Sequence, residues 1–400
     1  MRVPPEVYQM RAVLSERFPE LRPAQHMGLA LWVFGAVLAH SACQSAVLGA
    51  LIAAGVARRD AVRQRLREWL YDGADKAKPC AHEIAIERCF APLLRWVLAL
   101  WRGRRELALA IDATTHGAWL TALVISVLYR GTAIPVAWVI LPGNTKGPWL
   151  DPLLGLLDRL HAALPATERW TVLVLADRGL WSPRLWCGIR QLGWHPVLRV
   201  QQTITFAPAC GGQRGPACRL VRQGQAWVGR GGLRAHEPKL TVTLIAVWTL
   251  DQKEPWVLVT DLAPERVGIA WYALRMSIEL GFRLLKSLGW QWQHTRRRDP
   301  RRAARHWLIL AVATLWTLAY GTRAEAAEET GQPPARLCVP PPRGSDRPCR
   351  PRLVSVFRRG LEVFCRCLAR GRLWRCLWLI PDPWPQPPDN LQIIRHGAPS

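Results

Sequence analysis

Apolar segments rich in β-branched residues follow one another between residues 106 and 200, and their order restricts the possible folds more than any other feature of this sequence. In chain order they predict three strands over 106–114, 119–128 and 133–141, a helix over 149–163, a strand over 171–176, a helix over 183–192 and a strand over 195–200. Short turns join the first three strands, which is typical of an antiparallel meander. A meander followed by alternating helices and strands predicts an α/β fold with a mixed sheet flanked by helices.

The rest of the sequence divides around this unit by composition. The first hundred residues are rich in Ala and Leu with few Gly or Pro residues, whereas glycines separate short β-rich runs after residue 200. We expect a helical N-terminal region over 1–103, the α/β unit over 104–200 and 262–322, a β-rich insertion over 201–261, a Pro- and Arg-rich linker over 323–352, and a C-terminal helix with an irregular tail over 353–400.

Charge is the strongest compositional signal. The 400 residues contain 54 Lys and Arg against 29 Asp and Glu, and the resulting net charge of +25 favours a polyanionic partner. Genome composition explains the excess of arginine over lysine equally well. Because 50% of the residues are hydrophobic, the chain has enough apolar surface to fold, and global disorder is excluded.

Cysteine usage and hydropathy bear on the cellular compartment. The 11 cysteines form no Cys-x2-Cys pair, and we interpret them as reduced thiols. The most apolar runs, over 27–39 and 307–320, are shorter than the roughly 18 residues that a membrane-spanning helix needs. The N-terminus lacks the layout of a signal peptide. We therefore expect a cytoplasmic protein without a membrane partner, with a polytopic membrane protein as the alternative.

Two aspartates occupy equivalent places in the predicted sheet. Asp112 ends the first predicted strand, and Asp177 follows the wholly apolar strand over 171–176. Burying a carboxylate unpaired is costly, so each side chain must reach the sheet edge, bind a cation or meet a basic group. Ligands collect at the carboxyl ends of strands in open α/β sheets, where both aspartates could share a metal site. Taken singly, each is more often a helix cap or a turn residue.

A third carboxylate comes from the helix predicted over 264–288. At about 100° per residue, Tyr272, Arg275, Glu279 and Lys286 lie within an arc of roughly 60° on this helix. The same spacing also fits a solvated face on which Arg275 and Glu279 form an ordinary ion pair. From spacing alone, both interpretations stay open.

This combination of residues resembles the DDE transposases of bacterial insertion sequences, specifically the IS4 family and the group that includes the Tn5 transposase. The predicted helix matches the Tyr-x2-Arg-x3-Glu-x6-Lys signature of that group at all four positions. The β-rich insertion also lies between the second aspartate and the glutamate, where this group carries one.

The resemblance implies a ribonuclease-H-like catalytic domain that cuts transposon ends and joins them to target DNA through a hairpin intermediate. Asp112, Asp177 and Glu279 would be the catalytic residues and would hold two Mg²⁺ ions, which Mn²⁺ can replace. The partner would be double-stranded DNA, as terminal inverted repeats and as target, bound by a homodimer in a synaptic complex at the bacterial nucleoid.

Further DNA contacts are implied around the catalytic helix. By the resemblance, Tyr272, Arg275 and Lys286 hold phosphates. Trp256 stacks on a flipped base, although packing explains this tryptophan equally well. Charge alone adds two basic groups, which are Arg296, Arg297 and Arg298 after the helix and Arg59, Arg63 and Arg67 on an amphipathic segment. A solvated helix face is the alternative for the second group, and a non-catalytic DNA-binding protein derived from a transposase is the competing function.

Overall fold

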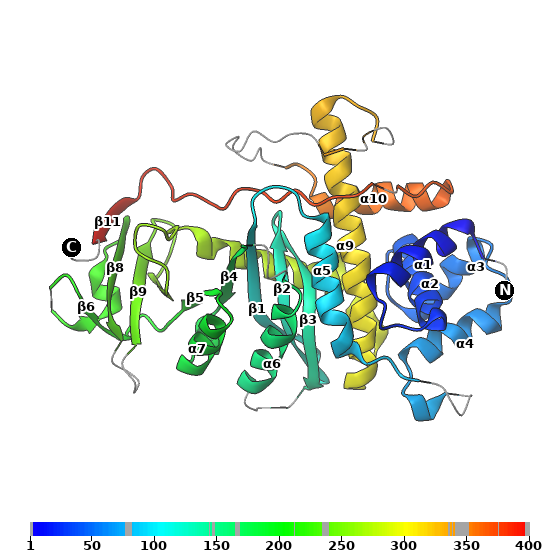
Figure 1. The fold of residues 1–400 in the computed structure, drawn as a ribbon, viewed down its shortest axis with the longest axis horizontal. Helices are drawn as coiled ribbons and strands as arrows, with labels where there is room; N and C mark the ends of the chain where they lie inside the picture. The colour runs from blue at the N-terminus through cyan, green and yellow to red at the C-terminus, as the bar shows by residue number, and fades with distance from the viewer. Residues whose placement is uncertain are drawn as a thin grey trace.

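The computed structural model describes residues 3–76, 82–143, 145, 149–164, 169–211, 213–233, 240–334, 337, 339–340, 352–374 and 376–396. A large mixed sheet occupies one side of the elongated molecule and a cluster of N-terminal helices the other, with the long helix α9 between them (Figure 1). This is the mixed α/β architecture, a sheet flanked by helices, that the order of predicted elements indicates.

Five strands form the half of the sheet nearest α9. They are β1 (Glu106–His116), β2 (Leu120–Tyr129), β3 (Thr132–Pro142), β4 (Thr171–Ala176) and β5 (His195–Arg199), in the spatial order β3-β2-β1-β4-β5. The first three are antiparallel neighbours because short turns join them, whereas β4 runs parallel to β1 and β5 parallel to β4. Ile111 pairs with Ala176 in the register of β1 with β4. The next residues along each strand, Asp112 and Asp177, therefore stand side by side.

The β-rich region extends this same sheet. Its strands are β6 (Thr205–Pro208), β7 (Gly215–Pro216), β8 (Gln225–Leu233), β9 (Leu240–Trp248) and β10 (Trp256–Thr260). The spatial order continues from β5 through β10, β9, β8 and β6 to β7, and β10 is antiparallel to β5. Continuous ladders of backbone hydrogen bonds thus connect the insertion to the strands that carry the two aspartates, which the sequence pattern does not indicate.

Helices cover both faces of the five-strand half. They are α5 (Phe90–Leu100), α6 (Leu150–His161), α7 (Pro183–Gln191), α8 (Met276–Arg283) and α9 (Pro300–Thr330). α6 and α7 lie in front of the sheet in Figure 1. α8 and α9 pack on the face that carries Asp112, because the side chain of Arg275 reaches this aspartate and the indole N–H of Trp138 donates to the carbonyl of Ala304.

The segment predicted as one helix over 264–288 is only partly α-helical. It contains a 3-10 turn, η5 (Trp271–Arg275), then α8, and then a π-helical turn, η6 (Leu284–Leu288). Residues 264–270 form turns instead of helix. Val267 and Ile269 are nevertheless buried in the core.

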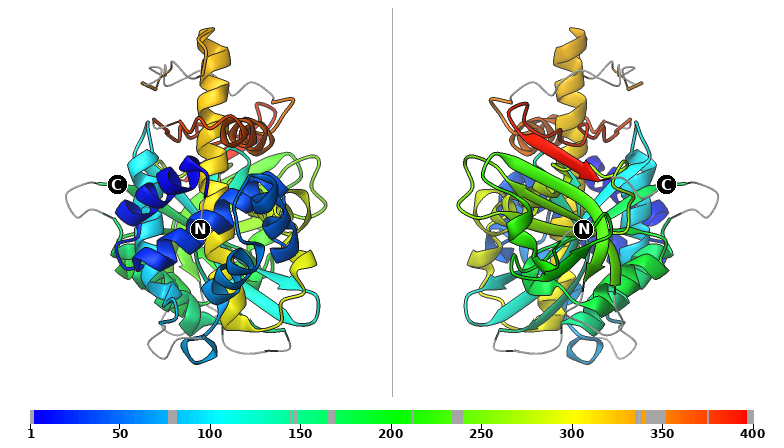
Figure 2. Two further views of the ribbon diagram at one scale, coloured as in Figure 1. Left: turned by 90° about the vertical axis from the view of Figure 1, so that its right-hand side faces the viewer. Right: turned by 90° about the vertical axis from the view of Figure 1, so that its left-hand side faces the viewer.

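The N-terminal helices pack against α9 on the side away from the sheet (Figure 1 and Figure 2). They are α1 (Pro5–Arg17), α2 (Pro23–Ala39), α3 (Gln44–Ala53) and α4 (Arg59–Leu70). In the described part of the chain, no single helix is long and apolar enough to cross a membrane, while α2 and α3 pass that test only as a pair bent by 88°. Further short 3-10 turns are η1 (Gly73–Asp75), η2 (Ile86–Cys89), η3 (Arg178–Leu180), η4 (Ala217–Leu220) and η7 (Trp292–Thr295).

The C-terminal part of α9 and the helix α10 (Val356–Ala369) cross at a glycine contact. Gly321 and Gly360 each face the backbone of the other helix and have no room for a Cβ atom. α9 continues to Thr330, so the linker predicted over 323–352 begins too early. Its last turns stay ordered because Arg323 bonds the carbonyl oxygens of Pro334 and Cys376. Much of the predicted linker after Pro334 lies outside the described residues.

The chain after α10 returns across the molecule and adds a strand to the sheet. β11 (Gln392–His396) pairs in parallel with β8, with Ile394 opposite Trp227. Figure 2 shows β11 lying along the outer strands of the sheet. The prediction of an irregular tail is therefore wrong for these residues, because β6 pairs only with the end of β8 and β11 pairs with the backbone groups from Gln225 to Gly229.

Candidate active site

The three predicted carboxylates come from three elements that meet where β4 ends. The prediction that Asp112 ends the first strand is wrong, because β1 pairs with β2 as far as His116. β1 and β4 bring Asp112 and Asp177 side by side, and α8 supplies Glu279 from the face above them. Burial raises the pKa of Asp112, and the charges of Asp177 and Glu279 both act on this carboxyl in the same direction. Residues spread over more than 160 positions of sequence thus share one electrostatic environment.

Arg275 lies between two of these carboxylates. Its Nη2 donates to Oδ2 of Asp112 at 2.8 Å, and its Nη1 donates to Oε1 of Glu279 at 3.4 Å. Only 9% of the Arg275 side chain is exposed, and a charge this buried requires a partner of opposite sign. The ion pair with Glu279 that helical spacing allows is present, but the shorter contact is the one with Asp112.

The Nε atom of this guanidinium takes part in neither of these two contacts. Nε of Arg275 is buried and has no hydrogen-bond partner among the residues that the structure describes. A buried N–H without an acceptor costs on the order of 1–3 kcal/mol. Arg275 therefore keeps an unused donor beside the carboxylates, where a further oxygen ligand could bind.

Burial dominates the electrostatics of Asp112. It raises the pKa of this carboxyl above its ordinary value, while the Arg275 guanidinium and the backbone N–H of Ala113 oppose the rise. The nearby negative charges of Asp177 and Glu279 raise the pKa further. A site that accumulates partly buried negative charge in this way favours cations.

Tyr272 and Trp256 border the second aspartate. The hydroxyl of Tyr272 lies 3.4 Å both from Oδ1 of Asp177 and from the carbonyl oxygen of Ala176. Burial, assisted by the charge of Asp177, raises the pKa of Tyr272, which keeps the phenol protonated as a donor. The half-buried ring of Trp256 meets the ring of Tyr272 edge-on at 5.4 Å.

Two charged residues of this site are absent from the sequence-based prediction. Arg199, the last residue of β5, places Nη1 3.6 Å from Oδ1 of Asp177 and donates through Nη2 to Glu254 at 3.0 Å. Since β5 is parallel to β4, the end of β5 must reach the same edge as Asp177, and this signal could have identified Arg199. Glu254 lies before β10 and gives no such signal, because its approach to Arg199 depends on the pairing of the insertion with β5.

The side chain of Lys286 lies further along the same face. Its charge lowers the pKa of His116 at the end of β1, after the larger effect of burial, and burial also lowers the pKa of Lys286. Asp112 and His116 lie four positions apart on β1 and so point to one face of the sheet. The helix that carries Glu279 therefore starts near Asp112 on β1 and crosses to β3, where Gly281 packs against Ala133.

The other predicted basic residues have different surroundings. Arg298 stacks on the half-exposed ring of Trp119 at 3.8 Å, and Arg296 is exposed. Arg297 turns inward, and burial together with the charge of Arg302 lowers its pKa to about 10, which argues against a surface phosphate contact. The three arginines of α4, which are Arg59, Arg63 and Arg67, are all exposed.

Within the described ranges, no three His, Cys, Asp or Glu side chains stand close enough together to hold a metal ion. The guanidinium of Arg275 occupies the space between Asp112 and Glu279 that a cation would share. The donor set of three carboxylates has the chemistry that Mg²⁺ binds, so the residue types fit this ion. Its binding would require Arg275 to give up its contact with Asp112.

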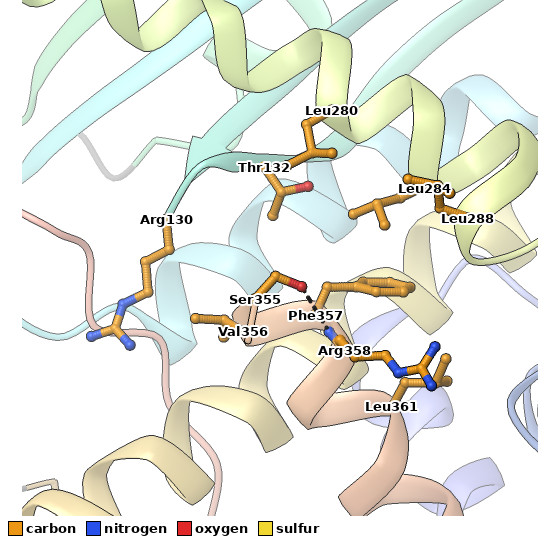
Figure 3. Close-up of a pocket in the computed structure, with 10 residues that line it drawn as sticks. All are labelled: Arg130, Thr132, Leu280, Leu284, Leu288, Ser355, Val356, Phe357, Arg358 and Leu361. Carbon is orange, nitrogen blue, oxygen red and sulfur yellow. Dashed lines mark hydrogen bonds between the residues drawn. The ribbon is translucent and has the colours of Figure 1, made fainter. Parts of the chain in front are cut away.

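A mostly apolar cavity lies beside the helix that carries Glu279, and none of the three carboxylates is among the residues that line it. It has a volume of about 280 Å³ and separates α8 and η6 from the start of α10. Leu280, Leu284 and Leu288 line one side, and Phe357 and Leu361 the other (Figure 3). Apolar walls of this kind suit packing but not phosphodiester chemistry.

Comparison with known proteins places this geometry in a family. Residues 103–316, more than half of the chain, match the transposase DDE domain. The chain belongs to this family of DDE transposases. It is similar to a solved structure of piggyBac transposase, a cryo-EM structure of a synaptic complex with hairpin DNA, with a TM-score of 0.42, 10% sequence identity, and coverage of 91% of this chain and 77% of that one. No curated protein matches the sequence.

Proposed function

We propose that this protein is a cut-and-paste DNA transposase of the IS4 type, and that residues 104–200 and 262–322 form its ribonuclease-H-like catalytic domain. The observation that carries the proposal is that the guanidinium of Arg275 joins Asp112 to Glu279. Asp177 follows β4 directly beside Asp112 on the neighbouring strand β1. The match of residues 103–316 to the transposase DDE domain supports the same reaction class. The strand order β3-β2-β1-β4-β5 supports the ribonuclease-H-like arrangement.

Asp112, Asp177 and Glu279 would hold two Mg²⁺ ions, or Mn²⁺ in their place, because such ions take carboxylate oxygens as ligands. Bound there, such ions would supply Lewis-acid chemistry for phosphodiester cleavage and transfer. Asp112 is half-buried between the other two and is the residue best placed to serve both positions.

The basic side chains of the site would bind the DNA backbone. Arg275 would exchange Asp112 for a phosphate oxygen, and its unused Nε–H supplies a further donor to that phosphate. Lys286, two helical turns beyond Glu279, would bind a phosphate further along the DNA backbone. Tyr272 would keep the carboxylate of Asp177 oriented through its hydroxyl.

Trp256 is the candidate for holding a flipped base during a hairpin step. Its half-buried ring lies against Tyr272 and within 5.8 Å of the Arg199 guanidinium, so it is fixed in place beside Asp177. A base stacked on such a ring gains about 1–3 kcal/mol. Trp256→Ala would then impair hairpin formation or resolution while the first nick persists, and unchanged hairpin yields would assign the ring to packing.

The exposed arginines of α4 would bind the terminal inverted repeats, with Arg296 and Arg298 on donor or target phosphates. We propose further that two copies join two ends in a synaptic complex and that the protein acts at the bacterial nucleoid, where its DNA substrate lies.

The test is cleavage of DNA that carries the ends of the protein's own element, with and without Mg²⁺. Asp112→Asn, Asp177→Asn and Glu279→Gln should each lower the cleavage rate by about 100-fold or more, because each removes charge at the reacting phosphate. End binding should change little. Asp151→Asn on α6 is the matched control, since this carboxylate is 64% exposed and pairs only with Arg184 in the described structure. Retained cleavage in any of the three variants would refute the assignment.

A non-catalytic DNA-binding protein is the second candidate, because no three metal-ligating side chains are grouped for an ion within the described ranges. End-specific binding by the wild-type protein, with no cleavage in either Mg²⁺ or Mn²⁺, would favour this function.

A further inference from the structure

The chain from Cys376 to His396 forms a strap that begins beside α10 and ends on the far part of the sheet (Figure 1). Its first anchor is on the five-strand half. Leu379 exchanges backbone hydrogen bonds with Leu100 and Arg102 at 2.7 and 2.8 Å. The backbone N–H of Ile380 donates to the hydroxyl of Tyr129 at 3.0 Å.

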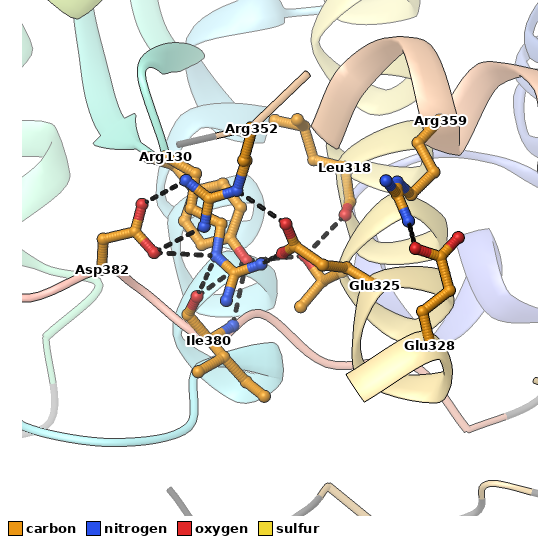
Figure 4. A network of polar contacts seen from close by, with 10 residues as sticks. Arg130, Leu318, Glu325, Glu328, Arg352, Arg359, Ile380 and Asp382 are labelled. Atoms are coloured by element: carbon orange, nitrogen blue, oxygen red, sulfur yellow. Dashed lines mark hydrogen bonds and ion pairs between the residues drawn. The ribbon is translucent and has the colours of Figure 1, made fainter. Parts of the chain in front are cut away.

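Charge reinforces this first anchor. Asp382 accepts two hydrogen bonds from Arg352 at 2.7 and 2.8 Å and lies 3.4 Å from Nε of Arg130 (Figure 4). Both arginines also contact Glu325 of α9. Because these groups are mostly buried, the alternating charges hold the start of the strap firmly on the domain.

The second anchor is β11, which pairs with five residues of β8. The side-chain amide of Gln225 adds a hydrogen bond to Gln392 at 2.9 Å. The strap is therefore anchored to the five-strand half near its start and to β8 at its end.

The strap contacts the segment that leads into the helix of Glu279 at two places, one between the anchors and one on β11 itself. The ring of Trp384 meets the ring of Trp271 edge-on at 4.7 Å. Arg395, on β11, donates to the carbonyl oxygens of Pro264 and Val267. Pro264 and Val267 lie in the stretch of turns between β10 and the helix, and Trp271 is the first residue of η5.

This stretch has few regular hydrogen bonds of its own. Residues 264–270 form turns, and the helix begins only with the short 3-10 turn at Trp271. Tyr272, Arg275 and Glu279 follow this stretch directly in the sequence. The position of the stretch therefore determines how far their side chains lie from Asp112 and Asp177. Irregular backbone with few internal contacts opens readily unless other groups hold it.

We propose that the strap is a positioning element of the active site, with Trp384 and Arg395 as the residues that hold the entry to the catalytic helix. It acts through Arg275 and Glu279 and touches no reacting atom. This inference rests on the proposed transposase function for its catalytic consequence, but its structural part can be measured without catalysis.

The structural part is tested by hydrogen exchange on the full-length protein without metal. Arg395→Gln and Trp384→Ala should speed exchange in residues 264–288 by about tenfold, while β1 and β4 keep the protection of the wild type. Arg395→Lys and Trp384→Phe should restore most of the protection, because they keep the cation and the ring. Ile393→Ala is the control on the same strand, since this side chain is 39% exposed and, being apolar, donates no hydrogen bond to the stretch.

The catalytic part is tested with end DNA at saturating protein and increasing Mg²⁺. A displaced Glu279 should raise the Mg²⁺ concentration needed for half-maximal cleavage by about three- to tenfold in Arg395→Gln, with end binding unchanged. A loss of protection throughout the protein, or no local change, would overturn the proposal, as would an unaltered Mg²⁺ requirement alongside faster local exchange. If the wild-type protein cleaves no end DNA, the transposase function fails, and the exchange data still decide whether the strap holds the helix entry.

Discussion

The guanidinium of Arg275 lies 2.8 Å from the carboxylate of Asp112, although the two residues are 163 positions apart in the sequence. This contact holds the 3-10 turn before α8 against the first strand of the sheet. It also neutralises a carboxylate that burial would otherwise favour in its protonated form. Arg275 thus has two roles, one in the metal-free protein and one proposed on DNA.

Replacing Arg275 by Met should weaken the metal-free fold. Breaking a buried ion pair by removing one partner costs about 3–5 kcal/mol, and the lower end is expected because Asp112 is partly accessible. Mg²⁺ should then raise the melting temperature of the variant more than that of the wild type, since the ion would relieve the uncompensated carboxylates. Thermal unfolding with and without Mg²⁺ measures both effects.

Arg184→Met is the control for this change, because its partner Asp151 is also an aspartate but both side chains are largely exposed. Its stability should change by less than about 1 kcal/mol. An equal response of wild type and Arg275→Met to Mg²⁺ would contradict the role of Arg275 between the carboxylates.

Gly281→Ala should move the catalytic helix away from the sheet. A Cβ at this position would lie 2.8 Å from Cβ and 3.2 Å from the backbone N of Ala133 on β3. The clash should cost about 1–3 kcal/mol, which outweighs the gain of about 1 kcal/mol in helix propensity. Urea unfolding measures the difference, and cleavage should fall with it because Glu279 shares the helix.

Ala133, which faces Gly281 from β3, provides the control for this change. Ala133→Gly would remove the atom that the new methyl group meets, so the double variant should recover part of the stability. A single variant more stable than the wild type would mean that the helix and β3 are less tightly packed than the structure has them.

His306 should make the protein sensitive to acid. Its ring is fully buried in α9 beside Trp32, and burial lowers its pKa well below the ordinary value. The neutral ring is therefore favoured in the folded state, so its stability contribution is complete above about pH 6.5 and is lost as the pH falls. The loss from this group should approach about 1.4 kcal/mol per pH unit.

His306→Leu should therefore gain stability relative to the wild type as the pH falls from about 7 to about 5. Denaturant unfolding at several pH values measures the change, with His294→Leu as the control because that side chain is exposed. Parallel pH profiles of wild type and His306→Leu would argue against this origin of acid sensitivity.

The arginines of α4 should contribute to end binding through phosphates. Changing Arg59, Arg63 and Arg67 to Ala together should reduce the slope of log affinity against log salt by about 0.9 for each phosphate that the variant no longer neutralises. The variant should fold, because the three side chains are exposed while Val62, Leu66 and Trp69 form the buried face. Filter binding or anisotropy over a range of salt concentrations measures the slope.

A matched triple change of Arg159, Arg184 and Arg190, which are exposed on or beside α6 and α7, removes the same charge from another surface. If both triple variants show the same reduction in slope, the α4 stripe contributes only general positive charge. Deleting the N-terminal helices would be a poorer test, since they share one hydrophobic core with α9 and the sheet.

The sequence predicts the sheet strands most accurately where burial is complete. The strand predicted over 171–176 has the observed bounds of β4, because every inward and outward position of a central strand must be apolar. The spacing of Tyr272, Arg275 and Glu279 likewise predicts their shared direction, since a helix fixes it locally.

The sequence-based predictions are wrong where contacts between residues far apart in the sequence determine the structure. α9 extends beyond residue 322 because Arg323 and Glu325 find partners more than ten residues away, including Arg352. β11 forms because the part of β8 that β6 leaves unpaired receives it, and no local pattern near Gln392 signals that. In the active site the contact of Arg275 with Asp112, and the approach of Arg199 to Asp177, depend on strand order in the same way.

The continuity of the sheet from β3 to β7 has a mechanical consequence. Domains joined by a linker can rotate about a hinge, but strands joined by uninterrupted hydrogen-bond ladders bend only slightly. A displacement of the insertion would therefore reach Asp177 through the backbone. A pair of spectroscopic labels on β2 and β8 should report the same separation before and after the protein engages its substrate.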